Sequence, residues 1–198
     1  MKHLRICFVG DSFVNGTGDP ACLGWAGRLC VAAQQQGHEV TYYNLGIRRQ
    51  TSRDIAERWQ AEVAARLPTE CDGRIVFSFG VNDITLEEGK ERVALDESIE
   101  NTRRILLAAR SLFPTLMVGP PPVLEEEHNQ RIARLCEQLA QVAAALEVPY
   151  LEVFAPLQHV RAWKEEIASN DGSHPRAAGY AALAHLIEVW SAWRAWLR

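Results

Sequence analysis

Short apolar segments alternate along this chain with longer segments of helical periodicity, and that alternation restricts the fold more than any other feature. The apolar segments have the composition of buried strands, and they span residues 4–9, 38–44, 74–80, 115–119 and 148–154. The segments with helical spacing span residues 22–36, 51–67, 88–112, 125–146 and 176–198. Five β-α units in succession predict an α/β fold, in which helices cover both faces of a parallel sheet.

The length and composition are those of one globular domain. The 198 residues include 47% hydrophobic and 23% charged residues, a balance that is usual for a chain that buries a sizeable core. No linker, internal repeat or low-complexity segment divides the sequence. We therefore expect a single domain over residues 1–198.

Charge, hydropathy and cysteine usage argue against a nucleic-acid partner, a membrane-spanning segment, and disulfide or metal sites. The formal net charge is -4 and no basic block is present, which disfavours a nucleic-acid partner. No segment of about 20 apolar residues is found, so we expect no integral membrane association. The N-terminal apolar run is too short for a signal peptide, which predicts a cytoplasmic protein. The five cysteines are odd in number and widely spaced, so neither a disulfide framework nor a metal site is expected.

Three polar motifs directly follow the first three predicted strands. Ligands of open parallel sheets bind outside the carboxyl ends of the strands, so residues at these places are candidates for a functional site. Each motif taken alone is equally well explained as an ordinary turn. The motifs are Gly10-Asp11-Ser12, Asn44-Leu45-Gly46 and Gly80-Val81-Asn82-Asp83.

A fourth motif, Asp171-Gly172-Ser173-His174-Pro175, directly precedes the last predicted helix. The spacing across a glycine lets the Asp171 carboxylate reach one imidazole nitrogen of His174 and leaves the other nitrogen free to accept a proton. Because proline suits the first turn of a helix, we expect His174 at the N-cap. The alternative is a loop in which the histidine merely caps the helix.

Together the four motifs contain every part of an acyl-transfer site. Ser12 is the expected nucleophile, His174 the general base, and Asp171 the residue that orients the imidazole. The backbone N–H groups of Ser12 and Gly46 and the side-chain amide of Asn82 are the expected donors to an oxyanion. This chemistry requires no metal ion and no cofactor.

The order of these motifs, from residue 10 to residue 174, resembles the SGNH hydrolases, also called GDSL lipases or esterases. That family is named for a serine, a glycine, an asparagine and a histidine, which match Ser12, Gly46, Asn82 and His174 in this sequence, and Asp171 matches its third triad member. The resemblance implies a three-layer α/β/α sandwich with a flavodoxin-like, five-stranded parallel sheet.

Two positions depart from the pattern of that family. Residue 13 is Phe, where the family often has Leu or Ile, and any apolar side chain can pack there. A second glycine is frequent near position 49, where this chain has Arg49. Arg48 and Arg49 follow the expected oxyanion glycine, where they form either a solvated turn or a site for an acidic group of the substrate.

The leading functional hypothesis is a serine hydrolase that cleaves carboxylic esters with small to medium acyl chains. A carbohydrate O-deacetylase, a lysophospholipase and a thioesterase use the same chemistry and stay open. Two alternatives belong to other classes: a flavodoxin-like binding module and a catalytically silent scaffold. The sequence lacks the G-x-x-x-x-G-K-[ST] and G-x-G-x-x-G phosphate-binding motifs, which disfavours the binding module.

Three tryptophans recur along the last predicted helix, at Trp190, Trp193 and Trp196. Their spacing places them along one stripe of the helix. Packing over the sheet is the favoured interpretation, and a homodimer contact through this helix or a contact with lipid is the alternative.

Overall fold

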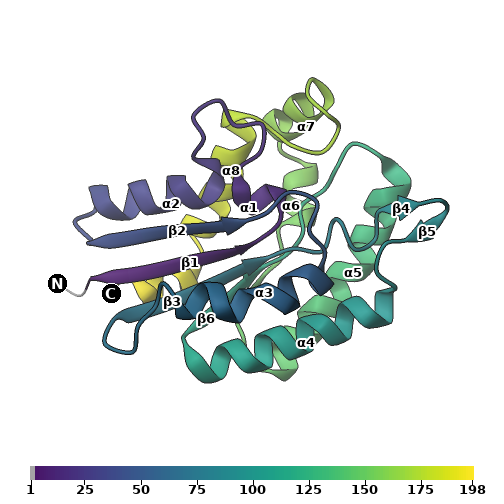
Figure 1. The fold of residues 1–198 in the computed structure, drawn as a ribbon. Coiled ribbons are helices and arrows are strands. Elements are labelled where there is room, and N and C mark those ends of the chain that lie inside the picture. The colour runs from purple at the N-terminus through teal and green to yellow at the C-terminus, as the bar shows by residue number, and fades with distance from the viewer. Residues whose placement is uncertain (1–2) are drawn as a thin grey trace.

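Five parallel strands form the centre of the molecule, as Figure 1 shows for the computed structural model, which describes residues 3–198. The strand order is β2-β1-β3-β6-β7. Their bounds are Leu4–Gly10 for β1, Val40–Gly46 for β2, Asp72–Ser78 for β3, Thr115–Val118 for β6 and Tyr150–Leu151 for β7. All four pairings are parallel, which confirms the predicted fold class.

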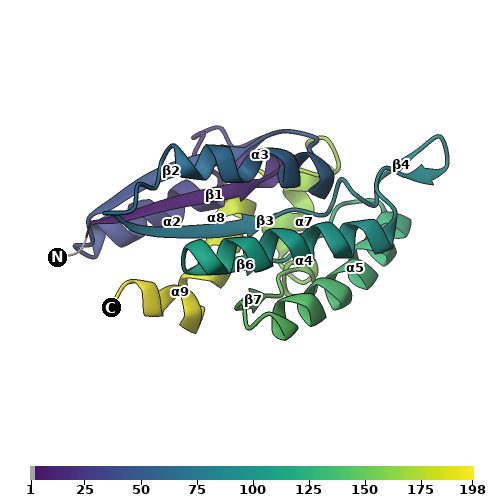
Figure 2. The same cartoon turned by 60° about the horizontal axis from the view of Figure 1, so that its bottom comes forward.

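Helices cover both faces of the sheet and complete the three layers, as the two views together show (Figures 1 and 2). One face carries α2 (Gly24–Gln35), α8 (Ala177–Glu188) and α9 (Ser191–Trp196). The other carries α3 (Ser52–Ala64), α4 (Leu95–Leu112) and α5 (Glu126–Ala145). Three short helices complete the chain, namely α1 (Ser12–Asn15), α6 (Phe154–Gln158) and α7 (Arg161–Ala168).

Strand β1, which lies between β2 and β3, is buried on both faces because its residues are apolar almost without interruption. Phe8 packs edge-on against Trp25 of α2, with ring centroids 5.5 Å apart. On the opposite face of the sheet, Phe77 of β3 makes the same kind of contact with Trp59 of α3. The continuous apolar run that the sequence shows at residues 4–9 is therefore explained by the two helical layers.

The register of β2, β1 and β3 brings their carboxyl ends together. Gly10 lies beside Gly46 of β2 and Ser78 of β3. A Cβ atom on Gly10 would lie 1.9 Å from the Ser78 carbonyl oxygen, so no larger residue fits there. The loops that carry the first three polar motifs consequently leave the sheet at one edge.

The predicted helix over residues 88–112 is wrong in its first turns. Residues 86–91 form a two-stranded hairpin, made of β4 (Leu86–Glu87) and β5 (Lys90–Glu91), and the helix begins at Leu95. Glu88 and Gly89 both have positive φ, 53° and 77°, which is the conformation of a tight two-residue hairpin turn. The hairpin projects from the carboxyl edge of the sheet (Figure 1).

The predicted last helix is also interrupted. α8 ends at Glu188, and Trp190 is the extended N-cap residue of α9. The guanidinium of Arg194 donates to the Glu188 carbonyl at 3.1 Å and so satisfies a group that the break leaves free. Trp193 is buried against Phe8, whereas Trp190 and Trp196 are half-buried against the core.

Other expectations concern the chain as a whole. Among residues 3–198 no helix has both the length and the apolar character that crossing a bilayer requires. All five cysteines are free. The start of β1 and the end of α9 lie at the same end of the sheet, opposite the carboxyl ends of the strands (Figures 1 and 2).

The position of Trp193 generates a prediction about stability. We expect Trp193→Ala to lower the free energy of unfolding by about 3–5 kcal/mol, because it removes a fully buried indole and leaves a cavity. Trp190→Ala is the matched control, and its half-buried side chain predicts a smaller loss. Urea denaturation followed by circular dichroism measures both, and equal losses would contradict the placement of Trp193 in the core.

Candidate active site

Ser12 stands at the first position of the one-turn helix α1, which follows strand β1. Asp11 caps this helix, since its Oδ1 accepts a hydrogen bond from the Phe13 N–H at 2.9 Å. α1 ends at Gly16, whose φ of 82° turns the chain away. The nucleophile predicted from the sequence is thus placed at the sheet edge, with its N–H at the start of a helix.

Ser12, His174 and Asp171 form a continuous line of hydrogen bonds. The His174 Nε2 atom lies 2.7 Å from Ser12 Oγ, and its Nδ1 atom lies 2.6 Å from Asp171 Oδ2. The neutral imidazole with its proton on Nδ1 fits these contacts, because Nδ1 then donates to the carboxylate and Nε2 accepts from the serine hydroxyl. The structure therefore brings together three residues from the two ends of the chain.

Asp171 is held as a carboxylate by its own loop. Its Oδ1 accepts from the backbone N–H groups of Ser173 and His174, at 3.0 and 2.8 Å. Partial burial alone would raise the pKa of Asp171, but these bonds and the His174 ring hold it at about 2. Asp171 is accordingly charged at any pH near neutrality and available to stabilise an imidazolium.

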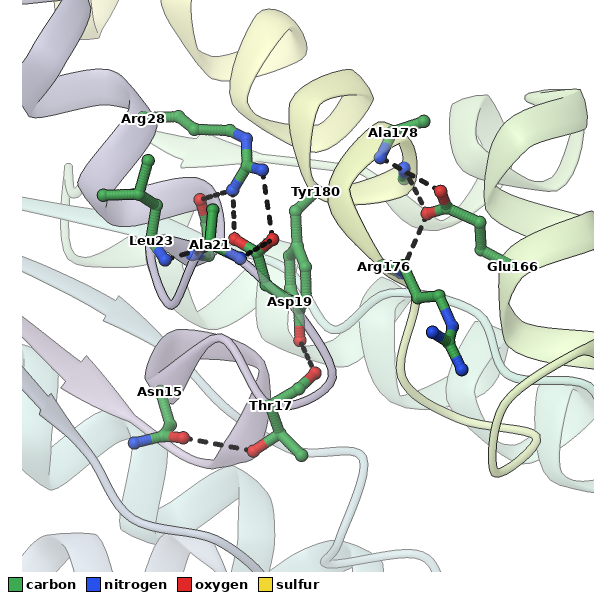
Figure 3. Close-up of polar contacts among 12 residues, drawn as sticks. Asn15, Thr17, Asp19, Ala21, Leu23, Arg28, Glu166, Arg176, Ala178 and Tyr180 are labelled. Carbon is green, nitrogen blue, oxygen red and sulfur yellow. Dashed lines mark hydrogen bonds and ion pairs between the residues drawn. The ribbon is translucent and has the colours of Figure 1, made fainter.

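His174 does not occupy the N-cap that the sequence predicts. α8 begins at Ala177 and its N-cap is Arg176, which makes no side-chain capping bond. The carboxylate of Glu166, on α7, caps α8 instead, and it accepts from the N–H groups of Arg176, Ala178 and Gly179 at 2.8, 3.1 and 2.7 Å (Figure 3). Because the cap comes from another helix, His174 is free to lie in the loop and face Ser12.

An aromatic side chain supports the imidazole. The Phe13 ring lies 5.0 Å from the His174 ring, between centroids, and stacks on Trp163 of α7 at 6.3 Å. Phe13, Trp163 and His174 are all buried. The departure at position 13 therefore gives an apolar surface that limits the movement of the histidine ring.

Asn82 faces the Ser12 segment from the loop after β3. Its amide nitrogen donates to Asp11 Oδ2 at 3.3 Å and to the Gln50 carbonyl at 3.0 Å. Burial raises the pKa of Asp11 to about 7, against the lowering effect of the Phe13 N–H. A buried carboxyl group therefore orients the amide that the sequence assigns to the oxyanion, and local sequence pattern gave no signal for that pairing.

Gly46, the second backbone donor that the sequence predicts, lies at the end of β2 beside Gly10 of β1. Its N–H donates to the side-chain oxygen of Asn44 at 2.9 Å, within the same motif. A Cβ atom on Gly46 would lie 2.2 Å from the Asn15 nitrogen. The close approach of α1 to β2 therefore requires a glycine at this position.

Arg49 adopts a left-handed conformation, with φ of 65°. Glycine takes this conformation without steric cost, which explains why a glycine is frequent at this place in the family that the sequence resembles. The Arg49 guanidinium pairs with Glu87 of the hairpin at 2.9 Å, and the backbone carbonyl of Arg49 accepts from the Arg92 side chain at 2.8 Å. These bonds connect the turn after β2 to the projecting hairpin.

The chain is similar to known proteins in both its sequence and its structure. The model of the GDSL-like Lipase/Acylhydrolase family matches residues 8–182. Acetylxylan esterase from Geobacillus stearothermophilus is 26% identical over 205 residues, covering 91% of this chain and 90% of that protein. The uncharacterized protein YpmR of Bacillus subtilis is 22% identical over 157 residues, which is 78% of this chain, and the chain spans about half (53%) of that relative's length.

Two solved structures share the fold. The lipase/acylhydrolase from Enterococcus faecalis has a TM-score of 0.78 at 24% identity, and the match covers 95% of this chain and 94% of that one. Axe2, an acetylxylan esterase from Geobacillus stearothermophilus, has a TM-score of 0.74 at 20% identity, with 98% and 96% covered. The likeness confirms the predicted α/β architecture.

The raised pKa of Asp11 makes a pH-dependent contribution to stability that can be measured. Between its ordinary value of 3.8 and about 7, the folded protein keeps a proton on Asp11 that the unfolded chain releases. The free energy of unfolding therefore falls as pH rises through this range. We expect Asp11→Asn to remove this fall, so that its stability relative to the parent improves by roughly 2–3 kcal/mol between pH 5 and pH 8.

Urea denaturation at several pH values tests this expectation. Asp96→Asn, at an exposed position on α4, controls for the loss of a carboxylate as such. Parallel stability curves for Asp11→Asn and the parent would show that Asp11 is ionised throughout and would contradict the expectation.

Proposed function

Because the chain belongs to the GDSL-like lipase/acylhydrolase family, we propose that it is a carboxylic ester hydrolase that forms an acyl-enzyme on Ser12. The observation that carries this proposal is the line of contacts from Ser12 Oγ through His174 to Asp171, at 2.7 and 2.6 Å. Family membership also favours a hydrolase over the binding and scaffold modules that the sequence left open.

The proposed reaction starts with transfer of the Ser12 hydroxyl proton to His174 Nε2 as Oγ attacks the ester carbonyl. Asp171, whose pKa is held at about 2, stays ionised and stabilises the imidazolium that forms. His174 then returns the proton to the leaving alcohol, which departs and leaves the acyl group on Ser12. Water, activated by the same imidazole, releases the acid and regenerates the serine.

The oxyanion of each tetrahedral intermediate needs donors that face it. Within residues 3–198 the Ser12 N–H forms no hydrogen bond, so it is available at the start of α1. The Asn82 amide makes its longer bond, 3.3 Å, to Asp11, and we propose that this hydrogen turns to the oxyanion as charge develops. The backbone N–H of Gly46 is the third proposed donor, since the strand register places Gly46 beside Gly10, two residues before Ser12.

A carbohydrate O-deacetylase is the second candidate within the same chemistry. It is favoured by the acetylxylan esterase from Geobacillus stearothermophilus, which aligns with nine-tenths of the chain. The two candidates are separated by comparing kcat/KM for p-nitrophenyl esters of increasing acyl length with acetate release from acetylated xylooligosaccharides. Preference for the sugar ester supports the deacetylase, and preference for longer acyl chains supports a general esterase.

The role of Ser12 gives the first functional prediction. We expect Ser12→Ala to abolish turnover of p-nitrophenyl acetate and to prevent labelling by a fluorophosphonate, because both reactions need the same nucleophile. Ser111→Ala, which removes a serine exposed on α4, is the control and should keep both reactions. Full activity of Ser12→Ala, or a label that mass spectrometry finds on another residue, would refute the proposal.

The role of Asn82 gives the second functional prediction. We expect Asn82→Ala to lower kcat by about 10²–10³ with a smaller change in KM, the usual cost of one oxyanion donor. Asn82→Asp keeps the shape of the side chain but removes the donor, so it should lower kcat as well. Steady-state kinetics at saturating ester measures both variants, and an unchanged kcat would exclude Asn82 from the oxyanion site.

A further inference from the structure

We propose that Tyr180 is a positioning residue that holds Ser12 and His174 within hydrogen-bonding distance through a bond to the Thr17 carbonyl. This inference rests on the proposed function, because it assigns to Tyr180 the geometry of the pair that the reaction uses. Tyr180 lies on α8, six residues after His174, and its hydroxyl donates to the Thr17 carbonyl oxygen at 2.8 Å (Figure 3).

The pair needs such a tie because its two members lie far apart in the chain. Ser12 and His174 are separated by 162 residues. The helix that presents Ser12 has four residues, which is too short to hold its own geometry without outside contacts. His174 lies in a loop before α8 rather than within the helix. Contacts between the two segments must therefore set the distance from Oγ to Nε2.

On the serine side, the bond reaches the nucleophile through one residue. The Thr17 N–H donates to the Ser12 carbonyl at 3.1 Å, and the Thr17 carbonyl accepts from Tyr180. The hydroxyl of Thr17 also donates to the Asn15 side chain at 3.2 Å (Figure 3). Thr17 thus joins the end of α1 to α8.

The turn that contains Thr17 is itself anchored to α2. The Asp19 N–H donates to the Gly16 carbonyl at 3.1 Å. The buried Asp19 carboxylate accepts from the Gly24 N–H at 2.9 Å and pairs with Arg28 of α2 (Figure 3). The Thr17 carbonyl, which accepts the Tyr180 bond, is therefore held in place by contacts that do not involve Tyr180.

On the histidine side, α8 is fixed by its neighbours. The Glu166 carboxylate on α7 binds three N–H groups at the start of α8, and the Asn170 amide donates to the His174 carbonyl at 2.9 Å. The Tyr180 ring is fully buried and packs edge-on against Trp163 at 6.5 Å. Tyr180 therefore projects from a rigid support toward Thr17.

The phenol acts as a neutral donor and not as an acid. Burial raises the pKa of Tyr180 well above its usual value of 10, so the hydroxyl keeps its proton wherever the protein is folded. The hydroxyl is bonded to a carbonyl oxygen of the backbone, whereas His174 Nε2 is bonded to Ser12 Oγ. Loss of this hydroxyl is expected to change the placement of Ser12 and to leave the proton-transfer groups themselves intact.

Tyr180→Phe removes the hydroxyl and keeps the ring. We expect kcat for p-nitrophenyl acetate to fall about tenfold or more, with KM changed by no more than about twofold, because small displacements between reacting groups are costly. The rate of Ser12 labelling by a fluorophosphonate should fall by a similar factor. Tyr150→Phe is the matched control, since the Tyr150 hydroxyl is buried on the edge strand β7, where it interacts with the side chain of Cys136.

A spectroscopic readout separates positioning from a general loss of structure. Asp171 and His174 belong to one loop, three residues apart, so their short hydrogen bond does not depend on Tyr180. The low-field proton resonance of that bond should persist in Tyr180→Phe while Ser12 labelling slows. Loss of the resonance together with activity would show that Tyr180 merely supports the loop, and it would overturn the proposal.

Two further outcomes are decisive. Absence of Ser12 labelling in the parent protein contradicts the proposed function itself, whereas equal labelling of parent and Tyr180→Phe contradicts only the role of Tyr180. If Tyr180→Phe does not fold, Glu166→Gln replaces it, because it loosens α8 from the side of α7 by removing one of two acceptor oxygens. Unchanged labelling in a folded Glu166→Gln variant would equally contradict the proposal.

Discussion

The close approach of backbone to backbone at Gly10 is the constraint on which the rest of the site depends. The Ser78 carbonyl occupies the space of a side chain at this position, and the Val14 side chain would lie 2.5 Å from an added Cβ atom. Strand β1 can therefore end between its two neighbours and turn at once into the helix that carries Ser12. Gly46 does the same for the approach of α1 to β2. Two glycines thus align the strand ends. Because the strand ends are aligned, the loops that follow them begin at the same edge of the sheet.

The elements of the fold were largely predictable because their signals are local. An apolar run buried by helices on both faces, as in β1, differs from the surrounding helical periodicity over a few residues. The two errors in the predicted helices occur where a turn or a break lies inside a segment of helical composition. Glu88 and Gly89 reverse the chain into a hairpin inside a segment of helical composition, and the break at Trp190 is compensated by Arg194, which a helical pattern does not reveal.

In the candidate site, too, local contacts were predictable from the sequence and contacts between distant segments were not. Asp171 and His174 lie in one loop, so the spacing of the motif is enough to predict their contact, and the position of Ser12 follows from the strand before it. Contacts between residues of distant elements have no recognisable pattern in the sequence. Asp11 and Asn82 are 71 residues apart, and Glu166 caps a helix that begins eleven residues later in another element. The hydrogen bond from the Gly46 N–H to the Asn44 side chain lies within one motif, but its spacing did not reveal it.

The start of β1 and the end of α9 lie at the amino edge of the sheet, which has a practical consequence for handling this protein. A tag or a surface linker joined ahead of β1 or after α9 would begin at the end of the sheet opposite α1, the helix that begins with Ser12 (Figure 1). The protein can therefore be immobilised through either end with the loops that carry Ser12 and His174 directed into solution.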